Sequence, residues 1–139
     1  MDEQLLTVND LIADARTLLL DTVGPNRYTD PELLVGLNTA LLEARRVRAD
    51  LFLGHYKGHV PKFNANDGET VHIEPQFRLA LVYGTLAHAL MRDEEDVQDA
   101  RANAFESKFI RLLIGNPLAI APIQGGTPGP QNAQKYLGY

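Results

Sequence analysis

Apolar side chains recur at intervals of three and four residues in four separate segments of this 139-residue chain. This spacing places the apolar side chains on one side of an α-helix, so each segment is predicted to be a helix with one buried face. The segments are residues 7–20, 29–53, 75–91 and 97–115. The sequence therefore predicts an all-α fold, with a four-helix bundle-like body formed by residues 1–115.

The second of these helices has the clearest start. Residues 24–26, Gly-Pro-Asn, favour a turn before it. Thr29 or Asp30 can then act as the N-cap, and Pro31 suits the first helical position because its missing N–H leaves no hydrogen bond unmade there. From this start the apolar spacing continues to about Leu53. We expect this helix to be the longest element of the fold.

A long central loop, residues 54–74, separates the second and third helices. It has no helical period, and it contains Gly54, Gly58, Pro61 and Gly68. Residues 71–73 alternate apolar and polar side chains, so they can pair with residues 60–63 in a small β-hairpin whose turn spans residues 64–68. A structureless loop of this length is uncommon in a compact domain, which favours a functional or partly ordered segment.

The composition changes abruptly after Gly115. Residues 116–139 contain four of the eight prolines, four of the eleven glycines and one charged side chain, Lys135. Such a segment has too few core-forming residues to fold alone, so we expect an extended C-terminal arm that becomes ordered on a partner. The apolar residues available to anchor it are Leu118, Ile120, Ile123, Tyr136, Leu137 and Tyr139.

Composition excludes several classes of protein. A formal net charge of −5 is unsuited to a protein that coats nucleic acid, because phosphate neutralisation requires clustered Lys and Arg. The absence of cysteine excludes disulfides, thiol catalysis and thiolate zinc sites. The acidic start does not resemble a signal peptide, and the longest aliphatic runs are far too short to span a bilayer. We therefore expect a soluble protein with no membrane contact.

The sequence contains no convincing catalytic or metal-binding motif. His55 and His59 are four residues apart, and His72 and His88 could complete a set. However, one glycine precedes His55 and another lies between the two histidines, which makes a helix there unfavourable. The one serine, Ser107, has no neighbouring histidine in the sequence. We therefore predict no enzyme, no bound cofactor and no metal ion.

A local basic run lies in the second predicted helix. Arg45 and Arg48 share one side of a helix while Arg46 points elsewhere, so the three cannot form one DNA-reading face. We expect them to pair with acidic side chains, such as Glu43 and Asp50 or those of a neighbouring chain. In a ring-shaped assembly these three arginines could line the lumen or a seam between subunits.

Two groups of residues carry a resemblance to a known family. The first group reads IADARTLLLDT, RYTDPELL and LNTA at residues 12–22, 27–34 and 37–40. The second reads YGTLAHALMRDEE, ANAF and FIRLLIG at residues 83–95, 102–105 and 109–115. In this order they resemble the opening and closing helices of the small head-to-tail adaptor (connector) proteins of tailed bacteriophages.

The resemblance implies a structural virion protein of the neck, assembled in the host cytoplasm. Such proteins form a homo-oligomeric ring, usually of twelve subunits, beneath the portal protein. The ring extends the channel through which double-stranded DNA passes without sequence-specific binding, and it provides the platform for the tail or nozzle protein. The resemblance also implies that the arm reaches the portal, with Tyr136, Leu137 and Tyr139 as portal anchors and Ile120 and Ile123 nearer the ring body.

Three alternatives stay open at this stage. A small helical nucleic-acid-binding or regulatory protein would use the arginines at positions 45, 46 and 48, and its binding would depend steeply on salt. A phosphohydrolase-like helical enzyme would use the histidines with Asp93 and a metal ion. A tail-completion or neck protein would lie one layer further from the portal. The role of Asn38, a polar residue in a leucine-rich helix, is also open between a buried contact that fixes helix pairing and simple exposure.

Overall fold

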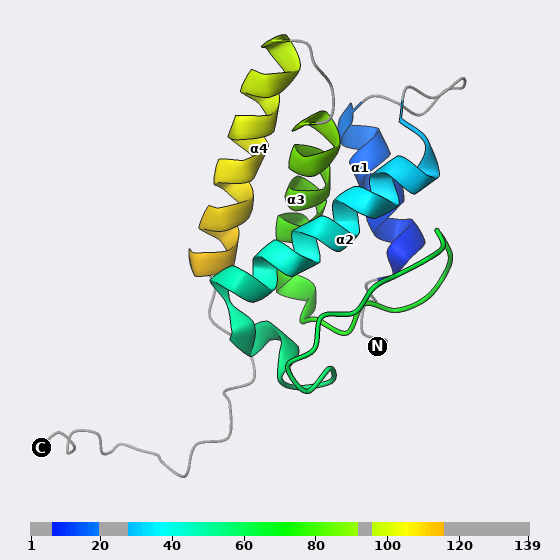
Figure 1. The fold of residues 1–139 in the computed structure, drawn as a ribbon, viewed down its shortest axis with the longest axis vertical. Helices are drawn as coiled ribbons and strands as arrows, with labels where there is room; N and C mark the ends of the chain where they lie inside the picture. Colours follow the sequence, from blue (N-terminus) through cyan, green and yellow to red (C-terminus); the bar gives the residue numbers. More distant parts are fainter. Residues whose placement is uncertain (1–6, 20–27, 92–95, 116–139) are drawn as a thin grey trace, which may run out of the picture.

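The computed structural model describes residues 7–19, 28–91 and 96–115, and in these residues the fold is all-α as predicted (Figure 1). Two short 3₁₀ helices, η1 and η2, flank the central loop. None of the described helices is both long and apolar enough to cross a membrane. The elements in chain order are α1 (Val8–Leu19), α2 (Asp30–Val47), η1 (Ala49–Phe52), η2 (Pro75–Phe77), α3 (Arg78–Met91) and α4 (Asp96–Gly115).

Helix α3 lies at the centre of the body and packs against the other three helices. Figure 1 shows α4 alongside α3 and α2 running diagonally across α3. Helix α1 lies near the start of α2 and also packs on α3. Helix α3 is apolar almost all round, as expected of a helix that is covered on several sides. The largest fully buried side chains include three phenylalanines, one each from η1, η2 and α4: Phe52, Phe77 and Phe109.

Two glycines allow α2 and α3 to approach closely. A Cβ atom on Gly36 would lie 2.8 Å from the backbone oxygen of Thr85. A Cβ atom on Gly84 would lie 2.8 Å from the Cβ of Ala40 and 3.0 Å from the ring of Phe109. These separations are shorter than van der Waals contact, so the crossing depends on the absence of both side chains.

The start of α2 agrees with its sequence signals. Thr29 is the N-cap, and its side chain accepts a hydrogen bond from the backbone N–H of Glu32, whose side chain accepts one in return from the Thr29 N–H. Asp30 has a different role, because it forms an ion pair with Arg16. The Arg16 guanidinium also donates to the Tyr28 carbonyl at 2.7 Å and so fixes the entry to α2 against α1.

The prediction that α2 continues to Leu53 is wrong, because the α-helix ends at Val47. With 18 residues it is also shorter than α4, which has 20, so α2 is not the longest element as predicted. Arg48 leaves the helical region with φ −142° and ψ 84°, and η1 follows. The physical reason lies in the contacts of the Arg48 side chain. Its guanidinium donates to Asp50 at 2.6 Å and to the Leu113 carbonyl near the end of α4 at 2.8 Å. A straight continuation of α2 would separate these groups.

The predicted β-hairpin in the central loop is also wrong, since the described residues contain no strand and a single isolated antiparallel bridge, between Thr7 and Thr70. The loop uses its backbone groups to complete other elements instead of pairing with itself. Two of its carbonyls accept hydrogen bonds from the first amides of α1, which no intrahelical partner can satisfy. These bonds are Val8 N–H to Glu69 O at 2.9 Å and Asn9 N–H to Asp67 O at 2.8 Å.

Candidate functional site

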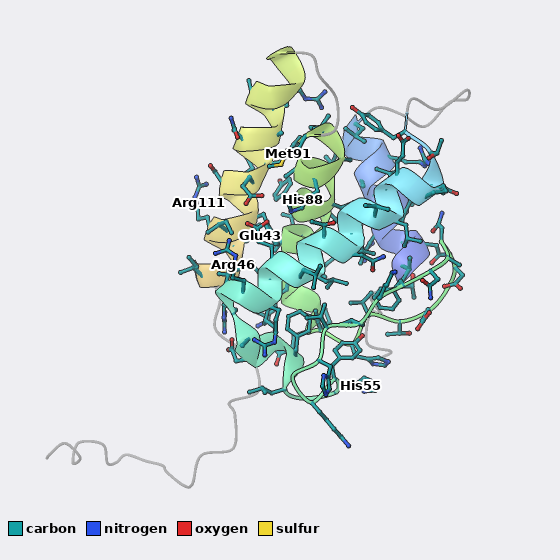
Figure 2. The ribbon with its side chains drawn as sticks, in the orientation of Figure 1. Glu43, Arg46, His55, His88, Met91 and Arg111 are labelled. Carbon is teal, nitrogen blue, oxygen red and sulfur yellow. The ribbon has the colours of Figure 1, made fainter. Side chains whose placement is uncertain are left out.

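Three polar side chains meet where α2, α3 and α4 pack together. They are Glu43 of α2, His88 of α3 and Glu106 of α4, and all three are partly buried. Figure 2 shows Glu43 and His88 near the crossing of α2 and α3, beside α4. Their positions follow from helix periodicity, because each falls in the series of buried residues of its helix. On α4 that series is Ala102, Glu106, Phe109 and Leu113.

The three side chains are close enough to interact directly. His88 Nε2 lies 2.9 Å from Glu43 Oε1, and the Arg46 guanidinium donates to the other oxygen of Glu43 at 3.2 Å. One ligating atom from each of Glu43, His88 and Glu106 lies within 4.8 Å of the other two. Glu106 Oε1 is buried and has no hydrogen-bond partner among the described residues. The arrangement thus combines two carboxyl groups, one imidazole and one unsatisfied buried oxygen.

The two carboxyl groups differ in acidity. Burial and the neighbouring Glu43 carboxylate raise the pKa of Glu106 from 4.5 to about 7. Burial also acts to raise the pKa of Glu43, but the hydrogen bonds from Glu106 and His88, with the charges of His88 and Arg46, outweigh it and leave that pKa below 4.5. At pH 7 Glu106 is therefore about half protonated while Glu43 is ionised, and the pair holds one proton, mainly on Glu106, only at lower pH.

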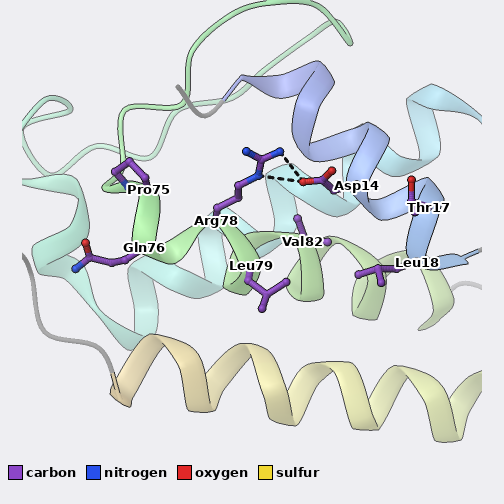
Figure 3. Close-up of a pocket in the computed structure, with 8 residues that line it drawn as sticks. All are labelled: Asp14, Thr17, Leu18, Pro75, Gln76, Arg78, Leu79 and Val82. Carbon is purple, nitrogen blue, oxygen red and sulfur yellow. Dashed lines mark hydrogen bonds and ion pairs between the residues drawn. The ribbon is translucent and has the colours of Figure 1, made fainter. Parts of the chain in front are cut away.

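A surface groove lies between α1 and the start of α3, away from this cluster (Figure 3). It has a volume of about 410 Å³, and an ion pair between Asp14 and Arg78 at 2.7 Å forms part of its wall. The other lining side chains are mostly apolar, and Leu79 is 47% exposed. We call this surface the α1–α3 groove. Its lining residues are Asp14, Thr17, Leu18, Pro75, Gln76, Arg78, Leu79 and Val82.

A second apolar surface lies on the outer side of α2. Val35 and Leu42 are seven residues apart, which places them within about 20° of one another around the helix. Both are exposed, Leu42 by 60%, while the Gly36 and Ala40 side of the helix packs on α3. We call Val35 and Leu42 the α2 patch. On α3, Leu79 lies about 140° around the helix from Gly84, which faces α2, so the groove and the patch lie on nearly opposite sides of the body.

The structure separates the three arginines of the basic run. Arg48 is 17% exposed, pairs with Asp50 and lies over the Phe77 ring at 5.4 Å. Arg46 is 72% exposed and pairs with Glu43 at 3.2 Å, while Arg45 donates to the Gly58 carbonyl at 2.9 Å. The expected pairing with acidic side chains is confirmed for Arg46 with Glu43 and for Arg48 with Asp50, whereas Arg45 bonds to a backbone carbonyl instead. Of the three, Arg45 and Arg46 are exposed, whereas Arg48 connects the end of α2 to α4 within the chain.

The four histidines do not come together. His55 and His72 stack in the central loop with ring centroids 3.7 Å apart, and His59 is exposed in the same loop. His88 lies in α3 and interacts with Glu43. A four-histidine site is therefore not formed, and Asp93, which an enzyme of that kind would use, lies outside the described residues.

The predicted arm anchors also lie outside the described residues. They are Ile120, Ile123, Tyr136, Leu137 and Tyr139.

The association of Glu43, His88 and Glu106 was not predicted from the sequence, in which the three residues lie far apart. A signal did exist, because each of these ionisable residues stands at a helix position that otherwise carries core residues. An ionisable side chain in such a position needs a partner, and the partners were on other helices.

No family model matches the chain, and neither a curated protein nor a solved structure matches it. Function is therefore inferred from the residues and surfaces described above.

Proposed function

We propose that this chain is a structural subunit of a bacteriophage virion, a head-to-tail adaptor that forms a ring beneath the portal protein. The observation that carries the proposal is the presence of two apolar surfaces on nearly opposite sides of the body, the α1–α3 groove and the α2 patch. The resemblance of residues 12–40 and 83–115 to adaptor proteins supplies the kind of ring and its partners.

A ring needs two different surfaces on each subunit. In a head-to-tail contact the surface of one copy meets a different surface of the next, and the assembly closes when the rotation between copies divides a full turn. A concave apolar groove and a convex apolar patch suit this geometry, because Leu42 or Val35 of one copy can enter the groove beside Leu79 of the next. Burial of exposed apolar side chains would then stabilise the assembly.

The arm supplies a third contact in this proposal. Residues 116–139 carry apolar side chains in a Pro/Gly-rich segment, a composition typical of segments that become ordered on a partner. We assign Tyr136, Leu137 and Tyr139 to the portal, and Ile120 and Ile123 to the neighbouring subunit or ring body. The tail or nozzle protein would then bind the opposite side of the ring.

The proposal assigns no catalytic activity to the chain. In the α1–α3 groove the ionisable groups are Asp14 and Arg78, and they neutralise one another. The Glu43, His88 and Glu106 cluster does not line this groove. The net charge of −5 suits a channel through which DNA slides, because an acidic wall repels the phosphate backbone.

The first test is co-purification with the candidate portal protein. The full chain and a chain truncated after Gly115 are each expressed with the portal, and the complexes are analysed by mass measurement and particle imaging. We expect the full chain to form a ring on the portal and the truncated chain to lose it. A ring that survives truncation would keep the adaptor assignment and remove the portal role of Tyr136, Leu137 and Tyr139.

A second test examines the two body surfaces. The double substitution Val35→Asp/Leu42→Asp places two charges in the α2 patch, and we expect it to abolish ring formation while the helical content is unchanged. The matched control is Asn103→Asp/Ser107→Asp, which adds two charges to exposed polar positions of α4. We expect the control to assemble normally. If both variants assemble equally well, the α2 patch is not part of the interface between subunits.

The result that overturns the proposal is a full chain that binds neither the portal nor other neck components. Salt-sensitive DNA binding in the same sample would favour the nucleic-acid-binding alternative, with Arg45 and Arg46 as the exposed cations. A monomer in the absence of portal protein agrees with the proposal, because portal binding can template the ring.

A further inference from the structure

We infer that Glu43, His88 and Glu106 form a binding site for one divalent transition-metal ion, which ties α2, α3 and α4 together. The inference is independent of the proposed ring, because all three ligands belong to one subunit and lie within its body. It adds a binding function to a part of the molecule that the adaptor proposal does not use.

The distances between the three side chains suit a bound ion. Zinc-ligand bonds of about 2.0–2.2 Å place neighbouring ligand atoms about 3.3–3.6 Å apart in a tetrahedral site. The three candidate ligand atoms lie within 4.8 Å of one another, and His88 Nε2 and Glu43 Oε1 are 2.9 Å apart. Small rotations of the two glutamate side chains would therefore complete the site, without movement of the helices that carry them.

Glu106 also offers an oxygen atom that lacks a hydrogen-bond partner among the described residues. This atom, Oε1, is buried. Buried polar atoms in folded proteins nearly always have a partner, and a bound ion is one explanation for an exception. A cation placed between the three side chains would give this oxygen a ligand bond.

The surroundings hold the ligands in position. Arg46 donates to Glu43 Oε2, which leaves Glu43 Oε1 directed at His88. Hydrogen bonds of this kind orient the side chains that coordinate metal ions in known sites. The three helices that supply the ligands are also fixed by close packing, since Gly84 and Phe109 are in contact beside the cluster.

The ligand set indicates the class of ion. Two carboxylate oxygens and one imidazole nitrogen suit Zn²⁺, Mn²⁺ or Fe²⁺, whereas Ca²⁺ and Mg²⁺ prefer oxygen alone. Three protein ligands leave at least one position for water. Binding requires the neutral imidazole with Nε2 unprotonated and both carboxylates ionised, so the proton shared by Glu43 and Glu106 is released to the buffer.

The test is calorimetric titration of the full chain, first stripped of metal with a chelator, with Zn²⁺, followed by Co²⁺ titration with visible absorption as the readout. We expect one ion per chain, and Co²⁺ absorption bands typical of mixed nitrogen and oxygen ligands. Titration in two buffers of different ionisation enthalpy should reveal proton release on binding.

Three variants make the test specific. Glu106→Gln and His88→Gln each remove one ligand with little change in volume, and we expect each to weaken Zn²⁺ binding by about 100-fold or more. The control is His55→Gln/His72→Gln, which removes the stacked loop histidines and should leave the affinity unchanged. Circular dichroism and the urea midpoint of each variant establish that the helices remain folded.

Two outcomes would overturn the inference. One is a wild-type chain that binds neither Zn²⁺ nor Co²⁺ in the micromolar range, which would leave a shared proton between Glu43 and Glu106 as the complete description of the cluster. The other is binding that persists in Glu106→Gln and His88→Gln but disappears in His55→Gln/His72→Gln, which would place the ion in the central loop.

Discussion

The side-chain amide of Asn38 pairs with both backbone groups of Phe63. Its Nδ2 donates to the Phe63 carbonyl at 2.8 Å, and its Oδ1 accepts from the Phe63 N–H at 2.9 Å. An amide can make this pair because it carries one acceptor and one donor side by side, as the backbone does. Asn38 therefore fixes the central loop to α2, rather than one helix to another, and the Phe63 ring is buried at the same point.

Asn38→Ala should destabilise the body by about 1–3 kcal/mol, because the N–H and carbonyl of Phe63 would lose their partners in a partly buried position. Urea unfolding followed by circular dichroism measures the change. Asn64→Ala is the control, since Asn64 is exposed in the same loop. Equal stability of the two variants would contradict the role given to Asn38.

The helix starts were predictable because their signals are local. The capping box of Thr29 and Glu32 and the proline between them lie within four residues, and no distant contact is needed to place them. The apolar spacing likewise identified most of the buried residues of α1, α2 and α3, whereas on α4 it correctly identified Phe109 and Leu113 but not Ala102. Local chemistry and tertiary packing agree in these segments, which is why the all-α fold followed from the sequence.

The errors arose where distant contacts decide the local structure. Helix α2 ends at Val47 because Arg48 reaches the Leu113 carbonyl, 65 residues further along the chain. The loop avoids a hairpin because its carbonyls cap α1 and its Phe63 backbone binds Asn38. The cluster of Glu43, His88 and Glu106 was missed for the same reason, since three helices supply one residue each.

Gly36→Ala should lower the free energy of unfolding by about 1–3 kcal/mol, because the new methyl group would overlap the Thr85 backbone oxygen at 2.8 Å. Backbone atoms cannot move aside without separating α2 from α3. Alanine favours an isolated helix by about 1 kcal/mol over glycine, so destabilisation here would be due to packing alone.

The matched control is Gly54→Ala, because a Cβ atom at Gly54 would meet nothing within 4 Å. Thermal unfolding of both variants should show a lower midpoint for Gly36→Ala and an unchanged or slightly higher one for Gly54→Ala. A stabilised Gly36→Ala protein would mean that the two helices do not cross as closely as described.

Arg48→Ala should destabilise the body by about 1.5–3 kcal/mol, because it removes charge-assisted hydrogen bonds to Asp50 and to the Leu113 carbonyl. Arg45→Ala serves for comparison and should change stability by less than about 1 kcal/mol, since Arg45 is exposed and its contact is with the Gly58 carbonyl. Chemical denaturation of both variants decides between a structural and a purely surface role for Arg48. If the two losses are equal, Arg48 does not hold α4 to the end of α2.

The stability of the metal-free protein should depend on pH through Glu106. Its pKa is about 7 in the folded protein, raised by burial and by the neighbouring Glu43, against 4.5 for an unperturbed glutamate. The unfolded chain therefore loses this proton at lower pH than the folded chain. The stability that protonated Glu106 contributes is complete below pH 4.5 and is lost as the pH rises through about 7.

Glu106→Gln isolates this contribution, because glutamine keeps the shape of the side chain and cannot ionise. We expect the free energy of unfolding of the variant, minus that of the wild type, to increase as the pH rises from about 5 to about 8. Urea unfolding in the presence of a chelator measures both values. His88 and Arg46, which face the same carboxyl groups, are present in both proteins. A constant difference between the two proteins across this range would show that Glu106 is ionised in the folded state well below neutral pH, and the two carboxyl groups would then not share a proton.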